Sequence, residues 1–494
     1  MMNSAPTDSL LRRLFNESPR FQAGQVGLAR RWAFPTGALA VALAMSTSGA
    51  IAGQDAPQNA AIPSGFANGP AGKSELNTDA ASIPEEQRWS LHMQNTDIVQ
   101  GDHGFPAKYS GPTSLDSKGE TRETVSVDLL LGVRLWHGAE FHVDGLMWQG
   151  FGLSDARGAE GFPNGEAFRL GTKSPNYNLS RVFIRQVFGL GGEQEDVPDD
   201  SLHLAGKQDV SRITITLGRM SAKDIFDNNA YANDPRTQFL NWSLMANGAW
   251  DYPADSLGYM SGLAIELNQP KWAIRYGFFQ VPQVSNGTAL DQHFLEAWSM
   301  VTEFERRFSI AGHPGAVRVL GYLEHAHMGS FQEATDSFER PADITVSRDY
   351  RFKYGFGLNL EQEIVKNVGV FARLGWNDGR TEDWAFDDVD RTVSAGVSVK
   401  GEAWGRPNDV FGVAGALNGI TGVHRAFLAA GGTGILAGDG ALNYGLEKIV
   451  EAYYDAQIFK GVHVALDYQF VSDPAFNRDR GPVSVFAGRL RWEF

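Results

Sequence analysis

The sequence predicts an all-β fold, a transmembrane antiparallel β-barrel of about 16 strands around an aqueous lumen. Three observations support this prediction. Long segments alternate apolar and polar residues with a period of two. After Ala52, no segment is apolar and uncharged over the length that a membrane-spanning helix needs. The last segment, 484–494, is apolar on one face and charged on the other, which suits a wall between lipid and water.

The terminal segment displays its two faces most clearly. One face carries Phe486, Leu490, Trp492 and Phe494, and the other carries Arg489, Arg491 and Glu493. Successive residues of a strand point to opposite sides, so the first set is predicted to meet lipid and the second to meet water. We expect the barrel-assembly machinery to recognise the aromatic Phe494.

Residues 124–135 alternate in the same way, over a length that suits a tilted membrane-spanning strand. Shorter examples occur at 212–217, 272–278, 392–399 and 462–470. A soluble antiparallel sandwich would alternate similarly, because one face of each of its sheets is buried. Long strands, a secretory signal and aromatic residues near strand ends favour the barrel. These aromatic residues are Trp136, Trp148, Trp376 and Trp492.

The N-terminal residues 1–52 are predicted to be a secretory signal peptide. Arg30 and Arg31 precede an apolar run at 34–45, and small residues follow it up to Ala52. A membrane anchor is the alternative, but the apolar run is shorter than the roughly 20 residues that a spanning helix needs.

The remainder divides into a leader and the barrel. Residues 53–85 are rich in Ala, Pro, Ser, Asn and Gly, and we expect a flexible periplasmic leader there. Residues 86–494 are expected to form the barrel, in which strands, short turns and long loops leave room for on the order of 16 strands. The acidic stretches 192–200 and 378–390 are expected to be solvated loops.

A glycine-rich stretch at 431–440, GGTGILAGDG, has only a superficial likeness to a dinucleotide-binding loop, since no buried parallel strand precedes it. We expect Thr421 to cap a short helix that continues to Ala430, and Gly431 to end it. The glycines then form a flexible turn folded into the lumen.

Charge and cysteine content exclude several classes of function. The net charge is −15, from 43 Lys and Arg against 58 Asp and Glu, and no long basic run is present. Nucleic acid is therefore not expected as a partner, and neutral or cationic solutes are favoured over anions. The chain has no cysteine, which excludes disulfides, thiolate metal sites and cysteine nucleophiles.

One block is distinctive beyond its periodicity. Residues 217–242 read LGRMSAKDIFDNNAYANDPRTQFLNW, followed by WDYPAD at 250–255 and GY at 258–259. This block resembles the carbohydrate-selective porins of the OprB family, in which GKFSVxDxFD is followed by NxYAxDPRxxFLNW and then by FDYxAD with GY. Shorter matches are RET at 122–124, QGFGLS at 149–154, DRT at 390–392, WGRP at 404–407 and NRDRGP at 477–482.

The resemblance covers residues 89–494 and implies a 16-stranded barrel in the bacterial outer membrane. It implies passive, substrate-selective diffusion of sugars and polyols, with outer-membrane lipid around the barrel and no cofactor. Many family members open their mature region with a TGDWGGLR-like stretch, which is not found near Trp89. The transported solute can therefore differ from glucose.

A sugar pore needs polar groups that replace the hydrogen bonds of water and aromatic faces that contact the C–H surfaces of the sugar. Around the signature block, the candidates for substrate binding or constriction are Arg219, Asp227, Asn229, Asp234, Arg236, Asn241, Trp242, Trp250, Asp251 and Asp255. Alternatively, Asp227, Asp234 and Arg236 anchor a loop to the wall through salt bridges and an Asp-Pro turn.

Charged residues at inward positions elsewhere are expected to line the pore as a cross-strand ladder. They are Arg134, Arg181, Arg185, Arg275, Arg373, Asp467, Arg489 and Arg491. Two histidines two residues apart, His325 and His327, raise the possibility of a metal site. No third ligand follows at an obvious spacing, so we expect polar groups of the lumen there and no metal.

Three alternatives to a sugar-selective pore are considered. A barrel enzyme such as a lipid hydrolase would need a nucleophile, a histidine and an acidic partner; histidines are few and no Gly-x-Ser-x-Gly motif is present, so no enzyme is expected. An energised receptor would need a folded plug, for which the leader is too short and too polar. A general diffusion porin, or a passive polysaccharide export channel without sugar preference, remains the alternative function.

Overall fold

The computed structural model describes residues 86–167, 171–337 and 339–494. The predicted signal peptide, 1–52, and leader, 53–85, lie outside the described residues. Among the helices of the described part, none has the length and apolar character needed to cross a bilayer.

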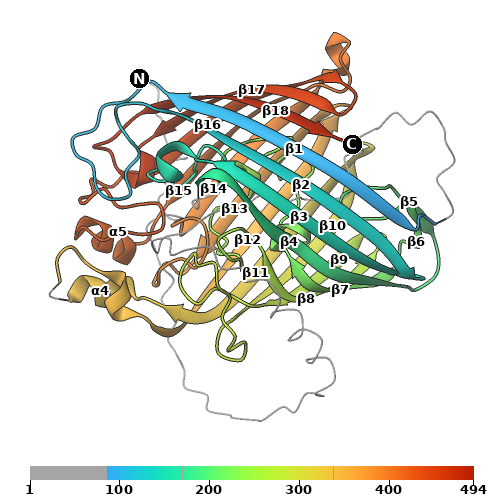
Figure 1. Cartoon of the computed structure of the whole chain (residues 1–494), viewed down its shortest axis with the longest axis horizontal. Helices are drawn as coiled ribbons and strands as arrows, with labels where there is room; N and C mark the ends of the chain where they lie inside the picture. Colours follow the sequence, from blue (N-terminus) through green and yellow to red (C-terminus); the bar gives the residue numbers. More distant parts are fainter. Residues whose placement is uncertain (1–85, 168–170, 338) are drawn as a thin grey trace, which may run out of the picture. The chain divides into compact units, whose positions relative to one another are not determined.

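Sixteen antiparallel strands form a closed barrel, which confirms the predicted fold class (Figure 1). The strands are β1 (Trp89–Asp102), β2 (Thr121–Trp136), β3 (Ala139–Gly150), β4 (Thr172–Gly189), β7 (Arg212–Met220), β8 (Met260–Gln269), β9 (Trp272–Phe279), β10 (Trp298–Ile310), β11 (His313–Met328), β12 (Asp349–Val365), β13 (Val368–Asn377), β14 (Arg391–Lys400), β15 (Val410–Gly419), β16 (Glu447–Phe459), β17 (Val462–Ser472) and β18 (Val483–Glu493). Each strand pairs with its neighbours along the chain, and β1 pairs with β18 to close the cylinder.

The two ends of the barrel differ in the length of their connections. One end carries long loops, with the helices α4 (Phe331–Asp336) and α5 (Gly422–Ala429) at the left of Figure 1. The other end carries short turns and a separate hairpin of β5 (Gln194–Val197) and β6 (Gly206–Asp209). The remaining short helices of the described residues are α3 (Trp242–Met245), η1 (Leu153–Asp155), η2 (Ala222–Asp224), η3 (Ile344–Ser347), η4 (Gly401–Trp404) and η5 (Pro474–Phe476). Outer-membrane barrels have long extracellular loops and short periplasmic turns, which orients this one.

The alternation of residues determines which side chains face lipid. On β2, Leu129 is 50% and Leu131 is 41% exposed, whereas the intervening Leu130 is buried. On β18, Phe486 and Leu490 are exposed, and Arg489 and Arg491 are buried inside. The predicted faces of both strands are confirmed.

Trp148 lies near the end of β3, as the sequence predicts, but its side chain is buried inside against Tyr259. Two local predictions are wrong. His325 and His327, expected in the lumen, lie on the outer face, where His325 packs against Phe352 with ring centroids 4.4 Å apart. The acidic stretch 378–390, expected to be solvated, is mostly buried.

Loops fold back and fill much of the barrel interior. A buried cluster inside the wall contains Phe162, Trp242, Tyr252, Phe386 and Leu436, which come from four different loops. The predicted helix after Thr421 is present as α5, and the Thr421 side chain accepts a hydrogen bond from the backbone N–H of His424. The glycine-rich segment beyond this helix packs inside, as expected.

Glycines on inward positions of the wall make room for these loops. A Cβ atom at Gly375 would lie 2.0 Å from Oδ1 of Asn247, and one at Gly357 would lie 2.3 Å from Nδ2 of the same side chain. A Cβ atom at Gly369 would lie 2.0 Å from the ring of Tyr231. The missing side chains therefore allow the loop that carries Asn247 and Tyr231 to contact the wall directly.

Candidate functional site

The loop at 221–259, here called the signature loop, crosses the barrel interior. It connects the neighbouring strands β7 and β8, yet its residues bind inward-facing groups around the whole wall. These wall groups are Asp128 on β2, Glu303 on β10, Asn359 on β12, Arg373 on β13, Glu451 on β16, Gln469 on β17 and Arg489 on β18. A loop that contacts strands from opposite sides of a cylinder narrows the path through it.

Asp227 anchors the first part of the signature loop. Its carboxylate accepts hydrogen bonds from Lys223 Nζ at 3.1 Å, Arg373 Nε at 3.1 Å and Asn359 Nδ2 at 2.7 Å. Burial by itself would raise the pKa of Asp227, but the charges of Arg373 and Lys223 outweigh it and lower the pKa to about 2. Asn229 extends this anchor, because its side-chain amide donates to Asn359 Oδ1 at 2.7 Å.

Arg236 anchors the Asp-Pro-Arg part of the loop. Its guanidinium lies 2.7 Å from Asp128 Oδ2 and donates from Nε to Glu166 Oε1 at 2.6 Å, and all three side chains are fully buried. Burial raises the pKa of Glu166, although the charge of Arg236 opposes that rise. Asp234 shapes the turn, since its carboxylate accepts from the backbone N–H of Arg236 at 2.9 Å.

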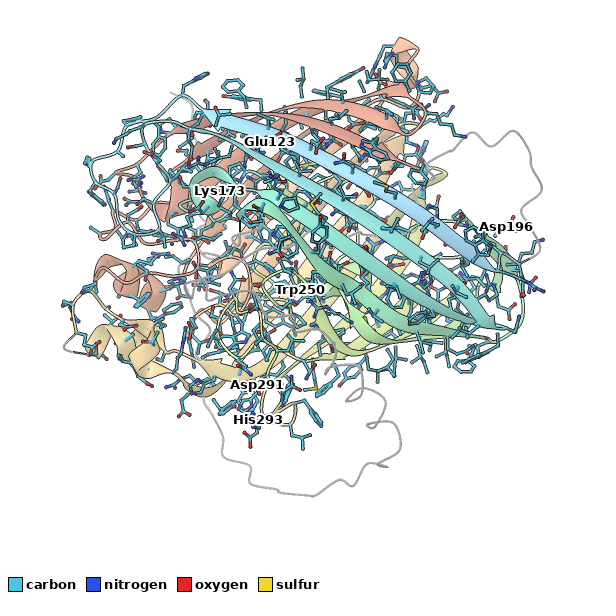
Figure 2. All side chains as sticks on the ribbon, viewed as in Figure 1. Glu123, Lys173, Asp196, Trp250, Asp291 and His293 are labelled. Carbon is cyan, nitrogen blue, oxygen red and sulfur yellow. The ribbon has the colours of Figure 1, made fainter. Side chains whose placement is uncertain are left out.

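Asn241 and Trp242 bind the next part of the loop to the wall and to other loops. The Asn241 side chain caps α3 and donates to Gln469 Oε1 at 2.9 Å. Trp242 is stacked on Phe162 at 4.9 Å between ring centroids and packs against Phe386 at 5.0 Å. Trp250 continues the aromatic cluster through Tyr252 at 5.1 Å; it lies midway between the two ends of the barrel in Figure 2.

Asp251 joins the signature loop to the loop at 378–390. Its two carboxylate oxygens accept from the backbone N–H groups of Trp384 and Ala385 at 2.7 and 2.8 Å. Burial raises the pKa of Asp251 to about 6, with the charge of Lys353 opposing the rise.

Asp255 and Arg219 fix the end of the signature loop. Asp255 accepts from the backbone N–H groups of Leu257 and Tyr259 and forms an ion pair with Arg219. Arg219 also donates to the carbonyl oxygen of Leu179 at 3.0 Å. Arg219 belongs to β7 itself and lies on the same face as the outward residues Ile215 and Leu217, so it is part of the wall and not of the loop inside it.

The predicted pore-lining arginines are paired with carboxylates inside the barrel. The pairs are Arg134 with Glu140, Arg181 with Asp144 and Asp224, Arg185 with Glu140, Arg275 with Glu303, Arg373 with Asp227, Arg489 with Asp455 and Arg491 with Glu493. Asp467 instead accepts from Gln469 Nε2 at 3.0 Å. These contacts fix the positions of the charged side chains inside the barrel.

Sequence reasoning missed several residues of the signature loop that remain partly accessible. Tyr231, Thr237 and Gln238 are half-buried, like the predicted Asp234, whereas the other loop candidates apart from Arg219 are buried. Burial, followed by the charges of Glu361 and Glu363, raises the pKa of Tyr231 to about 12, so its hydroxyl stays a neutral donor at pH 7. Their position inside the signature block was the only signal that could have found them.

A hollow lies among the long loops at the extracellular end. It has a volume of about 600 Å³ and is lined by Pro112, Arg340, Asp343 and Thr433, among others. Its lining therefore includes polar side chains and charges of both signs, on the extracellular side of the loops that fill the lumen.

Comparisons with known proteins agree with this architecture. The model of the carbohydrate-selective porin family OprB matches residues 113–494. The structure of Pseudomonas putida OprB at high pH is similar with a TM-score of 0.63 and 16% identity, over 82% of this chain and 94% of that one. Salmonella typhi OmpF in complex with daunomycin has a TM-score of 0.45 and 9% identity, over 83% and 98%. No curated protein sequence matches the chain.

The family match covers well over half of the sequence, and the fold of the described part agrees with it. This family and this fold are characteristic of passive outer-membrane channels and not of enzymes. The chain is therefore a bacterial outer-membrane porin that belongs to the carbohydrate-selective OprB family.

Proposed function

We propose that this porin mediates passive, substrate-selective diffusion of carbohydrates, chiefly monosaccharides and polyols, into the periplasm. The single observation that carries the proposal is the signature loop, which crosses the lumen and is fixed to the wall by buried hydrogen bonds and ion pairs. A fixed constriction discriminates by hydrogen-bond geometry and size, whereas a mobile one would adapt to many solutes.

The accessible groups of the constriction suit a neutral polyhydroxylated solute. Asp234, Thr237 and Gln238 are partly exposed polar side chains that also form hydrogen bonds within the loop. Tyr231 offers an aromatic ring with a neutral hydroxyl. The exchange of water for these groups keeps a hydroxyl-rich solute hydrogen-bonded, and the ring can contact its C–H surfaces.

The paired charges of the interior argue against an anion-selective channel. Each of Arg236, Arg275 and Arg373 is bound to at least one carboxylate at 3.1 Å or less. A polyanion would require unbalanced positive charge along its path. Because these cations are paired and the net charge of the chain is −15, neutral solutes are favoured over the alternative of an exporter of anionic polysaccharide.

Liposome swelling tests the proposal. We expect purified protein to admit monosaccharides and polyols faster than amino acids of similar size. Equal rates would reduce the function to general diffusion, and a reversal potential showing strong anion preference in planar bilayers would favour polysaccharide export.

A matched pair of variants locates the selectivity. Tyr231→Ala should reduce the preference for sugars, because it removes the accessible ring of the constriction. Tyr468→Ala, which removes a tyrosine 38% exposed on the outer face, should leave it unchanged. If both variants keep the wild-type preference, the signature loop does not select the solute.

The proposal that the barrel-assembly machinery binds Phe494 rests on one feature of the terminal strand. Phe494 is 65% exposed, while its backbone pairs with Met93 of β1. An aromatic side chain is thus available outside the closing seam. Phe494→Ala should slow the appearance of folded barrel in the membrane, measured by heat-dependent electrophoretic mobility.

A further inference from the structure

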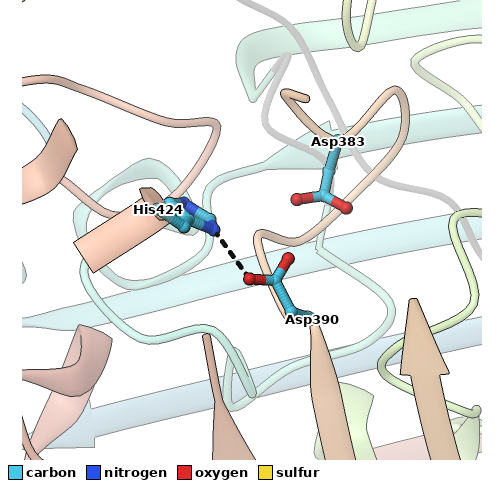
Figure 3. Close-up of side chains that lie close together, drawn as sticks. All are labelled: Asp383, Asp390 and His424. Atoms are coloured by element: carbon cyan, nitrogen blue, oxygen red, sulfur yellow. Dashed lines mark hydrogen bonds and ion pairs between the residues drawn. The ribbon is translucent and has the colours of Figure 1, made fainter. Parts of the chain in front are cut away.

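Two loops of the extracellular end bring together Asp383, Asp390 and His424 (Figure 3). Asp383 and Asp390 belong to the stretch 378–390, and His424 lies in the first turn of α5. One ligand atom from each residue lies within 4.8 Å of the corresponding atoms of the other two, and all three side chains are buried. The hydrogen bond from His424 Nδ1 to Asp390 Oδ2 measures 3.3 Å.

Each of these side chains keeps a buried polar atom without a hydrogen-bond partner. The atoms are Asp383 Oδ2, Asp390 Oδ1 and His424 Nε2. In Figure 3 the oxygen of Asp390 that is not bonded to His424 faces the carboxylate of Asp383. A buried carboxylate oxygen without a partner costs free energy, so this arrangement favours a ligand between the two carboxylates.

The surrounding charges leave a negative excess. Lys353 Nζ lies 2.5 Å from Asp383 Oδ1 and 3.8 Å from Asp251 Oδ2, so one ammonium group serves two carboxylates. Within the described residues, no lysine or arginine forms an ion pair with Asp390. Its Oδ2 is stabilised by His424 and by the backbone N–H of Thr421 at 2.6 Å.

We infer that Asp383, Asp390 and His424 form a binding site for a divalent transition-metal ion, with Zn²⁺ as the best fit. One imidazole nitrogen and two carboxylate oxygens form a ligand set that Zn²⁺ accepts, and histidine disfavours Ca²⁺ and Mg²⁺. Zinc–ligand bonds of about 2.0–2.2 Å place tetrahedral ligands about 3.4 Å apart. An ion bound by His424 Nδ1 and Asp390 Oδ2 would replace the hydrogen bond between them, and their separation of 3.3 Å fits this spacing.

A bound ion would join the stretch 378–390 to helix α5. The same stretch donates two backbone N–H groups to Asp251 of the signature loop. The metal would thereby fix the extracellular loops relative to the constriction, independently of which solute passes through it. Residues 34 positions apart supply the histidine and one carboxylate, which explains why no local sequence motif reveals the site.

Metal analysis of the full-length barrel tests the inference. Protein purified in detergent is treated with EDTA, dialysed against ZnCl₂ and then freed of excess metal, and its zinc content is measured by mass spectrometry. We expect one equivalent in the wild type and none in Asp390→Asn or His424→Ala. The control variant Asp291→Asn with His293→Ala removes another Asp–His pair, on the loop at 280–297 (Figure 2), and should keep the zinc. No zinc in the wild type, or unchanged zinc in the two site variants, would overturn the proposal.

Heat-dependent electrophoretic mobility identifies variants that fail to fold. If the site variants do not fold, two further measurements test the inference. X-ray absorption of zinc-loaded wild type should show a single imidazole among oxygen ligands, and a shell with two or more imidazoles would refute this site. Lys353→Gln should bind Zn²⁺ more tightly than the wild type by calorimetry, because the competing ammonium is gone. Weaker or equal affinity in folded Lys353→Gln would contradict the proposed position of the ion.

Discussion

Replacement of Arg236 by alanine should release the signature loop while the barrel remains assembled. The change removes the guanidinium that lies 2.7 Å from Asp128 and 2.6 Å from Glu166, and leaves two buried carboxylates without their cation. Removal of one partner of a buried ion pair costs about 3–5 kcal/mol. Since about 1.4 kcal/mol corresponds to a factor of ten, the population of the detached loop should rise roughly a hundredfold to several thousandfold.

Single-channel recording in planar bilayers measures the consequence. We expect Arg236→Ala to show a larger or fluctuating conductance and a weaker preference for sugars in liposome swelling. Heat-dependent mobility on gels should show a folded barrel, because every strand of the closed wall keeps its two hydrogen-bonded neighbours. Unchanged conductance and selectivity in the folded variant would refute the anchoring role of Arg236.

A neutral replacement of the whole triad provides the control. Arg236→Met combined with Asp128→Asn and Glu166→Gln removes all three charges together, so no uncompensated charge is buried. Such replacements of buried ion pairs are often neutral or stabilising. The triple variant should therefore recover much of the wild-type conductance, and a defect as large as that of Arg236→Ala would show that the charges themselves are needed.

Three further predictions concern other parts of the molecule. Gly369→Ala should displace the Tyr231 ring, which a Cβ atom would approach to 2.0 Å, and thus reduce sugar preference in swelling assays without loss of the folded barrel; an unaltered preference would argue against a role for the ring position. Burial raises the pKa of Asp251 and of Asp378 to about 6, so the folded chain holds these protons more tightly than the unfolded chain. The stability that these protons contribute is present below about pH 4 and is lost as the pH rises through about 6. The melting temperature of Asp378→Asn should therefore change less with pH across that window than that of the wild type. A larger change in the variant would contradict the reasoning. Replacement of residues 190–211 by a two-residue turn should raise conductance, since Leu202 of this segment belongs to the buried cluster inside the wall. A channel with wild-type conductance would exclude a restricting role for the segment.

The sequence by itself determined the wall of this protein. A strand has a side-chain period of two, so the alternation at 124–135 and 484–494 was sufficient to assign the lipid and lumen faces. The assignment failed at His325 and His327, because polar residues occupy both faces of β11 there. The pattern then does not show which residues point inward and which point outward. The residues of the signature block are contiguous, so the sequence could assign them to a single loop between two strands.

The tertiary structure alone decided what those residues contact. Arg236 meets Asp128 across more than 100 positions of sequence, and Asp251 meets Trp384 across 133. Such contacts depend on closure of the barrel and on loops folding into it, which no local periodicity encodes. For the same reason the acidic stretch 378–390 appeared solvated in the sequence, whereas in the fold it is buried beside Lys353 and His424.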